Sequence, residues 1–400
     1  MNYSKKALAI QPSITLAISA KAKEMKSQGI DVIGFGVGEP DFNTPLNIQE
    51  AAIKAIREGH TKYTPASGII ELKKAVVDKF WNENNLKYNE SQIIISTGAK
   101  QCLANLFQAV LNPGDEVIMQ IPYWVSYPEL IQLADGVPVF VETDEKNNFK
   151  LTLDKLQAAV TDKTKMILVN TPNNPTGTVY NKEDLQMIAD FAKEHDLLIL
   201  ADEIYEKLIY GDEKHISIAT LSEDAYNRTI IINGVSKSFA MTGWRIGYAA
   251  GNKDIIKLMA NIQSHTTSNP SSIAQYASLE ALTGPTDAQK AMIEEFKKRR
   301  DYMIKRINSI KGLSCIEPMG AFYVMMNISK LFGKEVEGEM ISDSLSFSNS
   351  LLAHAKVAAV PGIGFGVDDY VRLSYATSME NIENGLDRIE GYVKFYYKDL

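Results

Sequence analysis

Short apolar runs rich in isoleucine and valine alternate with longer segments of helical period between about residue 48 and residue 290. Seven of these runs predict strands, at residues 92–96, 116–120, 137–141, 165–170, 197–202, 229–233 and 246–250. Several are apolar on both faces, as buried parallel strands are. Helices are predicted over residues 100–111, 124–134, 182–194 and 253–263. The alternation predicts an α/β fold with a mostly parallel central sheet flanked by helices.

The last quarter of the chain has a different pattern. A long charged helix is predicted over residues 287–309, followed by apolar runs at 321–328, 357–362 and 370–376 and by a closing helix from about Met379. This pattern predicts a second, smaller α+β domain. We therefore expect a large domain at residues 48–290, and an N-terminal arm and small domain formed by residues 1–47 and 291–400. The basic residues 297–300 are expected on a solvated helix face, because Glu294 and Glu295 lie beside them.

Composition narrows the class of protein. The 400 residues are 45% hydrophobic and 23% charged, which is typical of a folded globular chain. The formal net charge of −7 supplies no basic field for nucleic acid. No run of 18 apolar residues occurs, so no membrane-spanning helix is expected. Gln11, Pro12 and Ser13 interrupt the apolar stretch near the N-terminus. We therefore expect an amphipathic helix over residues 13–28 instead of a signal peptide, and a cytoplasmic protein, which the presence of only two cysteines fits.

Several common catalytic signatures are absent. The sequence contains no GxxxxGK[ST], HExxH or GxSxG motif and no CxxC pair. Its five histidines do not approach one another at ligand spacing. We therefore predict no metal site.

Polar residues follow three of the predicted strands, where open parallel sheets place their ligands. Asn174 comes after the strand at 165–170 and precedes a proline, while Asp202 ends the strand at 197–202 and Tyr205 follows it. Lys237 and Arg245 follow the strand at 229–233. Taken singly, each has an ordinary interpretation: a turn asparagine, a helix N-cap or a solvated charge. Their convergence on one edge of the sheet favours a binding site.

Arg372 lies in an otherwise apolar strand, where its guanidinium group would be costly to bury without a carboxylate. Together these residues supply the groups that pyridoxal phosphate requires. We predict a lysine for the Schiff base (Lys237), a carboxylate for the pyridine nitrogen (Asp202), donors to the phenolate oxygen (Asn174, Tyr205) and groups that bind the phosphate (Arg245, Ser236).

At these residues the sequence resembles the class I pyridoxal-phosphate aminotransferases of fold type I. It is most similar to the bacterial aspartate aminotransferase subgroup typified by thermophilic enzymes. The resemblance runs through VGEPDFNTP (37–45), NTPNNPTGTVY (170–180), ADEIY (201–205), SKSFAMTGWRIGY (236–248) and VRLSYA (371–376), and covers nearly the whole chain. It implies the same roles for Lys237, Asp202, Asn174, Tyr205 and Arg245.

The resemblance also implies roles for residues that composition and spacing do not single out. Trp124 would stack on the cofactor ring. Gly98, Ala99 and Lys100 would begin a helix whose amide groups face the phosphate. Tyr63 would reach the phosphate of the cofactor bound in the neighbouring subunit, which implies a homodimer with shared active sites.

The resemblance also implies which residues bind the substrate. Arg372 would bind the α-carboxylate, with the Gly38 amide nearby, while Lys100 and Thr15 would meet the side-chain carboxylate of aspartate. Two positions depart from the pattern. Gly234 stands where many members carry a serine or threonine that donates to the phosphate, and Gln11 stands where members that use prephenate tend to carry a basic residue.

The expected activity is the exchange of L-aspartate and 2-oxoglutarate for oxaloacetate and L-glutamate. Three alternatives stay open at this point. The chain could prefer aromatic amino acids or prephenate, or it could be a lyase on the same scaffold. In a different class, it could be a regulatory module that binds pyridoxal phosphate, although no DNA-reading segment flanks the core.

Overall fold

The computed structural model describes residues 2–10, 14–211 and 214–398. Its largest sheet has seven strands in the order β2-β8-β7-β6-β5-β3-β4. The strands are β2 (Ile93–Ser96), β3 (Glu116–Ile121), β4 (Val137–Glu142), β5 (Thr164–Asn170), β6 (Leu198–Asp202), β7 (Thr229–Gly234) and β8 (Gly247–Ala250). β8 pairs antiparallel with both β2 and β7, and the other pairs are parallel. The predicted α/β sheet is confirmed.

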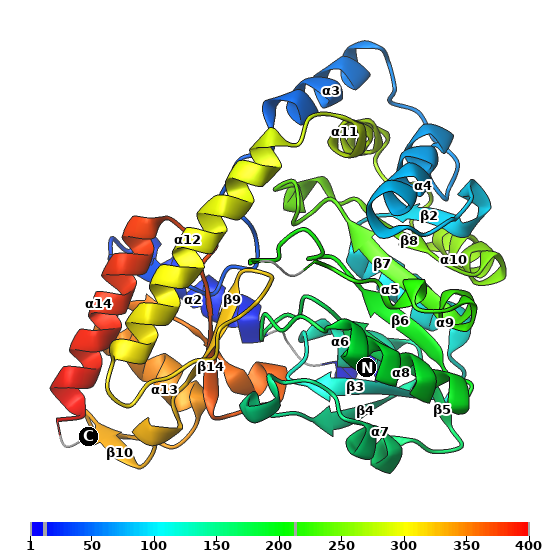
Figure 1. Ribbon diagram of the computed structural model, residues 1–400. Helices are drawn as coiled ribbons and strands as arrows, with labels where there is room; N and C mark the ends of the chain where they lie inside the picture. Colours follow the sequence, from blue (N-terminus) through cyan, green and yellow to red (C-terminus); the bar gives the residue numbers. More distant parts are fainter. Residues whose placement is uncertain (1, 11–13, 212–213, 399–400) are drawn as a thin grey trace.

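Helices cover both faces of this sheet (Figure 1). They are α4 (Ile70–Asn84), α5 (Ala99–Val110), α6 (Ser126–Leu133), α7 (Leu153–Ala159), α8 (Lys182–Glu194), α9 (Glu223–Arg228) and α10 (Lys253–Thr266). Beyond them, α3 (Leu46–Arg57) packs against α11 (Ser272–Thr283), which in turn packs against α4. In β2, Ile93 and Ile95 belong to one hydrophobic core, and Ile94 belongs to the core on the opposite face. Burial on both sides explains why these strands lack the alternation of apolar and polar residues.

The C-terminal part of the chain builds a second layer around smaller sheets. β13 (Val360–Pro361), β14 (Tyr370–Ser374) and β9 (Tyr323–Asn327) form an antiparallel sheet in that order. The pairs β1 (Ile33–Gly34) with β12 (Val357–Ala358) and β10 (Lys334–Val336) with β11 (Glu339–Ile341) complete the strands. The helices of this layer are α2 (Ile14–Ser27), α12 (Asp287–Ser309), α13 (Ser344–Ser350) and α14 (Met379–Tyr396). Figure 1 shows α12 and α14 side by side on this part of the molecule. The short helix α1 (Lys5–Ala9) lies instead beside the large sheet, where Lys6 donates to the backbone oxygen of Leu133 and pairs with Asp135.

The expectation of a solvated basic face on α12 was wrong for two of its four residues. Arg299 and Arg300 are buried. Arg299 donates to Asp41 at 2.7 Å and pairs with Glu295, whereas Arg300 pairs with Asp301 and stacks on Tyr210. Asp41 lies 258 positions away from Arg299, so the local sequence does not indicate the partner that makes its burial tolerable.

The carboxyl ends of the central strands meet at one edge of the large sheet. Asn170 at the end of β5 is in register with Asp202 at the end of β6, and Asp202 is in register with Ile232 of β7. This edge faces the smaller sheet, so residues of both sheets can contribute to one site. Within the described ranges, no helix has the length and apolar character needed to cross a membrane.

Candidate active site

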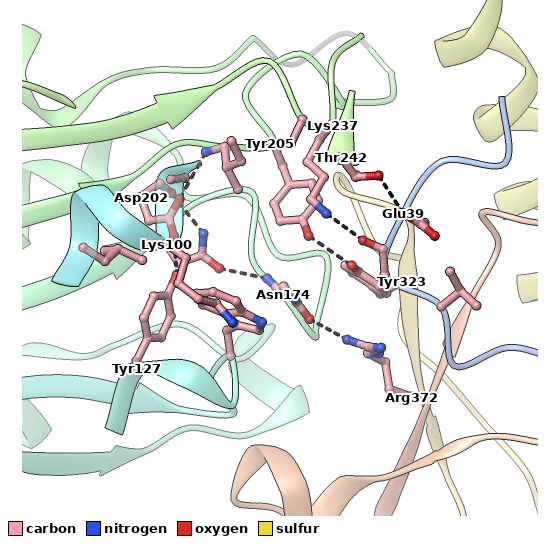
Figure 2. A pocket seen from close by; sticks show the side chains of 18 of the residues that line it. Glu39, Lys100, Tyr127, Asn174, Asp202, Tyr205, Lys237, Thr242, Tyr323 and Arg372 are labelled. Atoms are coloured by element: carbon pink, nitrogen blue, oxygen red, sulfur yellow. Dashed lines mark hydrogen bonds between the residues drawn. The ribbon is translucent and has the colours of Figure 1, made fainter. Parts of the chain in front are cut away.

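A cavity of about 500 Å³ lies where the large sheet meets the smaller one (Figure 2). Eleven of the predicted site residues line it: Gly38, Ala99, Lys100, Trp124, Asn174, Asp202, Tyr205, Ser236, Lys237, Arg245 and Arg372. Four basic side chains (Lys100, Lys237, Arg245, Arg372) and two acidic ones (Glu39, Asp202) are among the lining residues. A chain whose net charge is −7 thus concentrates positive charge in one cavity, which suits an anionic ligand.

Asp202 is held at the end of β6 with only 3% of its surface exposed. One carboxylate oxygen, Oδ2, accepts a hydrogen bond of 2.6 Å from the Tyr127 hydroxyl, and Oδ1 accepts one of 3.2 Å from the backbone N–H of Ile204. Burial raises the pKa of Asp202 to about 6, because a carboxylate loses its hydration there. The chain turns after Asp202 without forming a helix, so Asp202 is not a helix N-cap.

Lys237 follows β7, and its amine points into the cavity (Figure 2). The Nζ atom donates to the backbone oxygen of Gly38 at 2.6 Å. Burial, together with the nearby guanidinium groups of Arg245 and Arg372, lowers the pKa of Lys237 to about 8 against the opposing effect of Glu39. The amine is therefore partly neutral near neutral pH, as a nucleophile or a base must be.

Arg372 lies on β14 of the smaller sheet and is almost fully buried. Its guanidinium donates to Asn174 Oδ1 and to the backbone oxygen of Gly36, both at 3.0 Å. Both acceptors are uncharged, and the Nε atom has no hydrogen-bond partner. Among the residues that the structure describes, no carboxylate pairs with Arg372. A buried cation with spare donors is a receptor for a carboxylate ligand.

The first turn of α5 and Arg245 form a second anion-binding feature. Gly98 precedes α5 with a φ of +84°, and a Cβ atom there would lie 2.3 Å from Nη2 of Arg245. The missing side chain lets the guanidinium approach the N-terminus of the helix, whose free amide groups favour negative charge. Ser236 lines the same cavity.

Lys100 and Trp124 lie together at another wall of the cavity. The Nζ atom of Lys100 is 4.8 Å from the centre of the Trp124 ring. Partial burial and the neighbouring charge of Arg245 lower the pKa of Lys100. This lysine has no carboxylate partner among the described residues, which leaves it available to a ligand.

Three predicted residues are not among those that line this cavity, and Gly98, which precedes the lining residue Ala99, is one of them. Tyr63 is 88% exposed on the surface, away from the cavity lining of its own chain. The side chain of Thr15 lies outside the described part of the structure, as does Gln11. The departure at Gly234 has a packing reason, because a Cβ atom there would lie 3.0 Å from both the Cα of Gly247 and the backbone oxygen of Ile246.

The sequence did not point to two tyrosines that complete the site. Tyr127 donates to Asp202, and its ring packs edge-on against Trp124 with 5.2 Å between centres. Tyr323 hydrogen-bonds to the Tyr205 hydroxyl and stacks 4.3 Å from the Arg372 guanidinium. Both are buried tyrosines in apolar surroundings, which in a sequence resemble core residues.

Another polar cluster lies beside the site. Glu203, Glu206 and His215 bring ligand-type atoms within 4.8 Å of one another. The Nε2 atom of His215 is 3.0 Å from Glu203, and the ammonium group of Lys79 contacts the Glu206 carboxylate. Because Lys79 already brings a positive charge to these acids, we interpret the cluster as buried ion pairs. The absence of a metal site stays a prediction.

Comparison with known proteins identifies the family. The family model "Aminotransferase class I and II" matches residues 30–389. The chain belongs to the class I and II aminotransferases. The fold type I architecture and the aminotransferase activity expected from the sequence are thereby confirmed.

Individual aminotransferases are similar over nearly the full length. An aspartate aminotransferase of Bacillus sp. (strain YM-2) is 51% identical over 96% of this chain and 97% of its own. A probable aspartate/prephenate aminotransferase of Rickettsia felis is 48% identical over 95% of this chain and 94% of its own. The structure of Thermus thermophilus aspartate aminotransferase with maleate matches with a TM-score of 0.91, at 44% identity, and covers 98% of this chain and 99% of that one.

Proposed function

We propose that this aminotransferase transfers the amino group of L-aspartate to 2-oxoglutarate, giving oxaloacetate and L-glutamate, with pyridoxal phosphate as cofactor. The observation that carries the proposal is the shared cavity of Lys237 and Arg372. Lys237 offers a buried amine that is partly neutral, and Arg372 offers a buried guanidinium that has no acidic partner among the described residues. An α-amino acid has a carboxylate that can bind to Arg372 and an amino-bearing α-carbon that can face Lys237.

The donor set fits the cofactor. The guanidinium of Arg245 lies against Gly98 at the N-terminus of α5, and this positive charge together with the free amide groups of the helix suits a phosphate group. Asp202 would hold a proton on the ring nitrogen, Asn174 and Tyr205 would donate to the phenolate oxygen, and Trp124 would stack on the ring. When bound, pyridoxal phosphate supplies an electron sink for the charge that develops at the α-carbon.

Cofactor attachment, proton transfer and substrate orientation are proposed to depend on side chains of the protein. Lys237 would hold the cofactor through Nζ, release it to the amino group of the substrate, and then move the α-proton. Arg372 would fix the α-carboxylate and so orient the α-carbon toward Lys237. The Gly38 backbone, which accepts from Lys237 in this structure, closes the same side of the cavity.

Preference for aspartate is supported by Lys100. Its ammonium group lines the cavity with Trp124 and without a carboxylate partner in the described chain. A dicarboxylic substrate can reach Arg372 with one carboxylate and Lys100 with the other. The Thermus relative was crystallised with maleate, a dicarboxylate, which supports the same preference here. Thr15 is proposed as a hydroxyl partner of the second carboxylate.

We also propose a cytoplasmic homodimer in which Tyr63 reaches the cofactor phosphate of the partner subunit. Support comes from the exposure of Tyr63 and of large apolar residues in the same stretch of chain (Leu46, Ile53, Ile56, Ile70). The division into a cofactor-binding domain at 48–290 and a smaller domain formed by the rest is part of this proposal.

A single-turnover experiment tests the function. Protein loaded with pyridoxal phosphate is mixed with L-aspartate, without an oxo-acid acceptor, and the absorbance change of the bound cofactor is compared with that caused by L-phenylalanine. Faster conversion by aspartate supports the proposal. Faster conversion by phenylalanine would favour an aromatic aminotransferase and make the role of Lys100 wrong. Release of pyruvate or ammonia without an acceptor would indicate a lyase, and Lys237→Ala serves as the inactive control.

A further inference from the structure

Tyr127 forms the most direct side-chain contact with Asp202. It lies in the first turn of α6 with 1% of its surface exposed. Its hydroxyl donates to Asp202 Oδ2 at 2.6 Å, a short distance that is typical of a bond to an ionised acceptor. The Tyr127 ring also meets the Trp124 indole edge-on at an interplanar angle of 84°. Tyr127 therefore contacts two residues proposed to hold the cofactor ring.

No other side chain near Asp202 in the described structure makes the same hydrogen bond to its carboxylate. The Ile204 N–H donates to Oδ1, and Asn170 donates to the backbone oxygen and not to the carboxylate. In the part of the chain that the structure describes, no second side chain donates to either carboxylate oxygen. The titratable neighbours are Glu203 on the following residue, Lys237 after β7, Tyr205 in the turn after β6 and Cys102 on α5.

These neighbours have opposing effects on the carboxylate. Burial disfavours the ionised form most strongly, and the charge of Glu203 acts in the same direction. The Tyr127 hydroxyl has the largest opposing effect, ahead of the Ile204 N–H and the charge of Lys237. Tyr127 itself does not compete for the negative charge, because burial and Asp202 raise its pKa far above the usual range.

We propose that Tyr127 is a positioning residue for the cofactor: its hydroxyl fixes the orientation of the Asp202 carboxylate and keeps it ionised toward the ring nitrogen. The inference rests on the proposed function and goes beyond it. An aspartate that carried its own proton could not stabilise a protonated ring nitrogen, so the electron sink would be weakened. Tyr127 acts through Asp202 and needs no contact with the substrate.

The test compares Tyr127→Phe with Tyr180→Phe. Tyr180 is a matched control, because it is also 1% exposed and its hydroxyl also donates to a buried side chain, Gln120, at 2.8 Å. Tyr180 is not among the residues that line the cavity. A role in stability alone would make the two variants behave alike.

The first readout uses cofactor-free protein. Carbon-13 NMR of the aspartate carboxyl groups, with Asp202→Asn to assign the signal, follows the titration of Asp202. In Tyr127→Phe the midpoint should rise by about one pH unit or more, because a hydrogen bond to a charged group is lost. In Tyr180→Phe it should stay at the wild-type value.

The second readout uses the loaded enzyme. In Tyr127→Phe the acid limb of the pH profile of kcat should move to higher pH and kcat should fall about tenfold, while the KM for aspartate changes less than about twofold. In an Asp202→Asn background the same substitution should have almost no further effect on kcat, because the group through which it acts is gone.

An unchanged Asp202 titration in Tyr127→Phe would overturn the inference, and so would an equal loss of kcat in both phenylalanine variants. If Tyr127→Phe does not fold, 3,5-difluorotyrosine at position 127 replaces it. This stronger donor should lower the Asp202 midpoint, and no change would overturn the proposal. Failure of the proposed function is distinguishable, because it would leave the wild type unable to transaminate whatever the titration shows.

Discussion

The hydroxyl oxygens of Tyr205 and Tyr323 lie 3.0 Å apart and share a buried hydrogen bond. Tyr205 follows β6 of the large sheet, and Tyr323 begins β9 of the small one. The guanidinium of Arg372 also stacks on the Tyr323 ring, with its central carbon 4.3 Å from the ring centre. The side chain of Tyr323 thus contacts both Tyr205, which is proposed to donate to the phenolate oxygen of the cofactor, and Arg372, which is proposed to bind the substrate carboxylate.

This relationship predicts different results for two substitutions of Tyr323. Tyr323→Phe removes the hydrogen bond and keeps the ring, so it should cost about 1 kcal/mol in the free energy of unfolding and leave the KM for aspartate within about threefold. Tyr323→Ala also removes the stacking on Arg372, and its KM should rise by about tenfold or more. Urea unfolding and steady-state kinetics measure both effects. Equal KM values in the two variants would contradict a role for the ring.

Arg372 should show a conflict between stability and function. Arg372→Met removes a buried cation that has no acidic partner among the described residues and whose Nε is unpaired. We expect kcat/KM for aspartate to fall by about a thousandfold, while the free energy of unfolding of the cofactor-free protein stays equal or rises by about 1 kcal/mol. A large loss of stability in Arg372→Met would indicate that Arg372 stabilises the fold, and would contradict a role confined to ligand binding.

Much of the fold was predictable because it depends on local patterns. The helices over 182–194 and 287–309 begin and end where their periodicity predicts, and the strands match within one or two residues. The site residues at the strand ends were predictable for the same reason, since the topology of a parallel sheet brings those ends together.

The features that could not be predicted from the sequence depend on contacts between distant parts of the chain. Tyr127 meets Asp202 across 75 positions, and Tyr205 meets Tyr323 across 118. Nothing in the local sequence separates such tyrosines from ordinary core residues, because their function lies in one hydroxyl group and its partner. The burial of Arg299 was missed for the same reason.

Lys100 should matter for dicarboxylic substrates alone. Lys100→Ala removes a charge that has no carboxylate partner in the described chain, so we expect the KM for L-aspartate to rise by about tenfold to a hundredfold. The KM for L-alanine, which lacks the second carboxylate, should change less than about threefold. Steady-state kinetics with both substrates provide the measurement and its internal control. Similar increases for both substrates would contradict a role in binding the second carboxylate.

Burial of Lys237 should appear in the pH dependence of stability. Its pKa of about 8 in the folded chain lies below the ordinary value of 10.5, so the unfolded chain binds more protons between these values. The cofactor-free protein should therefore gain stability from this group as the pH rises from about 8 to about 10.5. Relative to the wild type, Lys237→Met should be more stable by about 3 kcal/mol below pH 8, and this advantage should disappear above pH 10.5. Urea unfolding of both cofactor-free proteins across this range measures the difference. A difference independent of pH would mean that Lys237 keeps an ordinary pKa, and that its amine is not prepared by burial to act as a base.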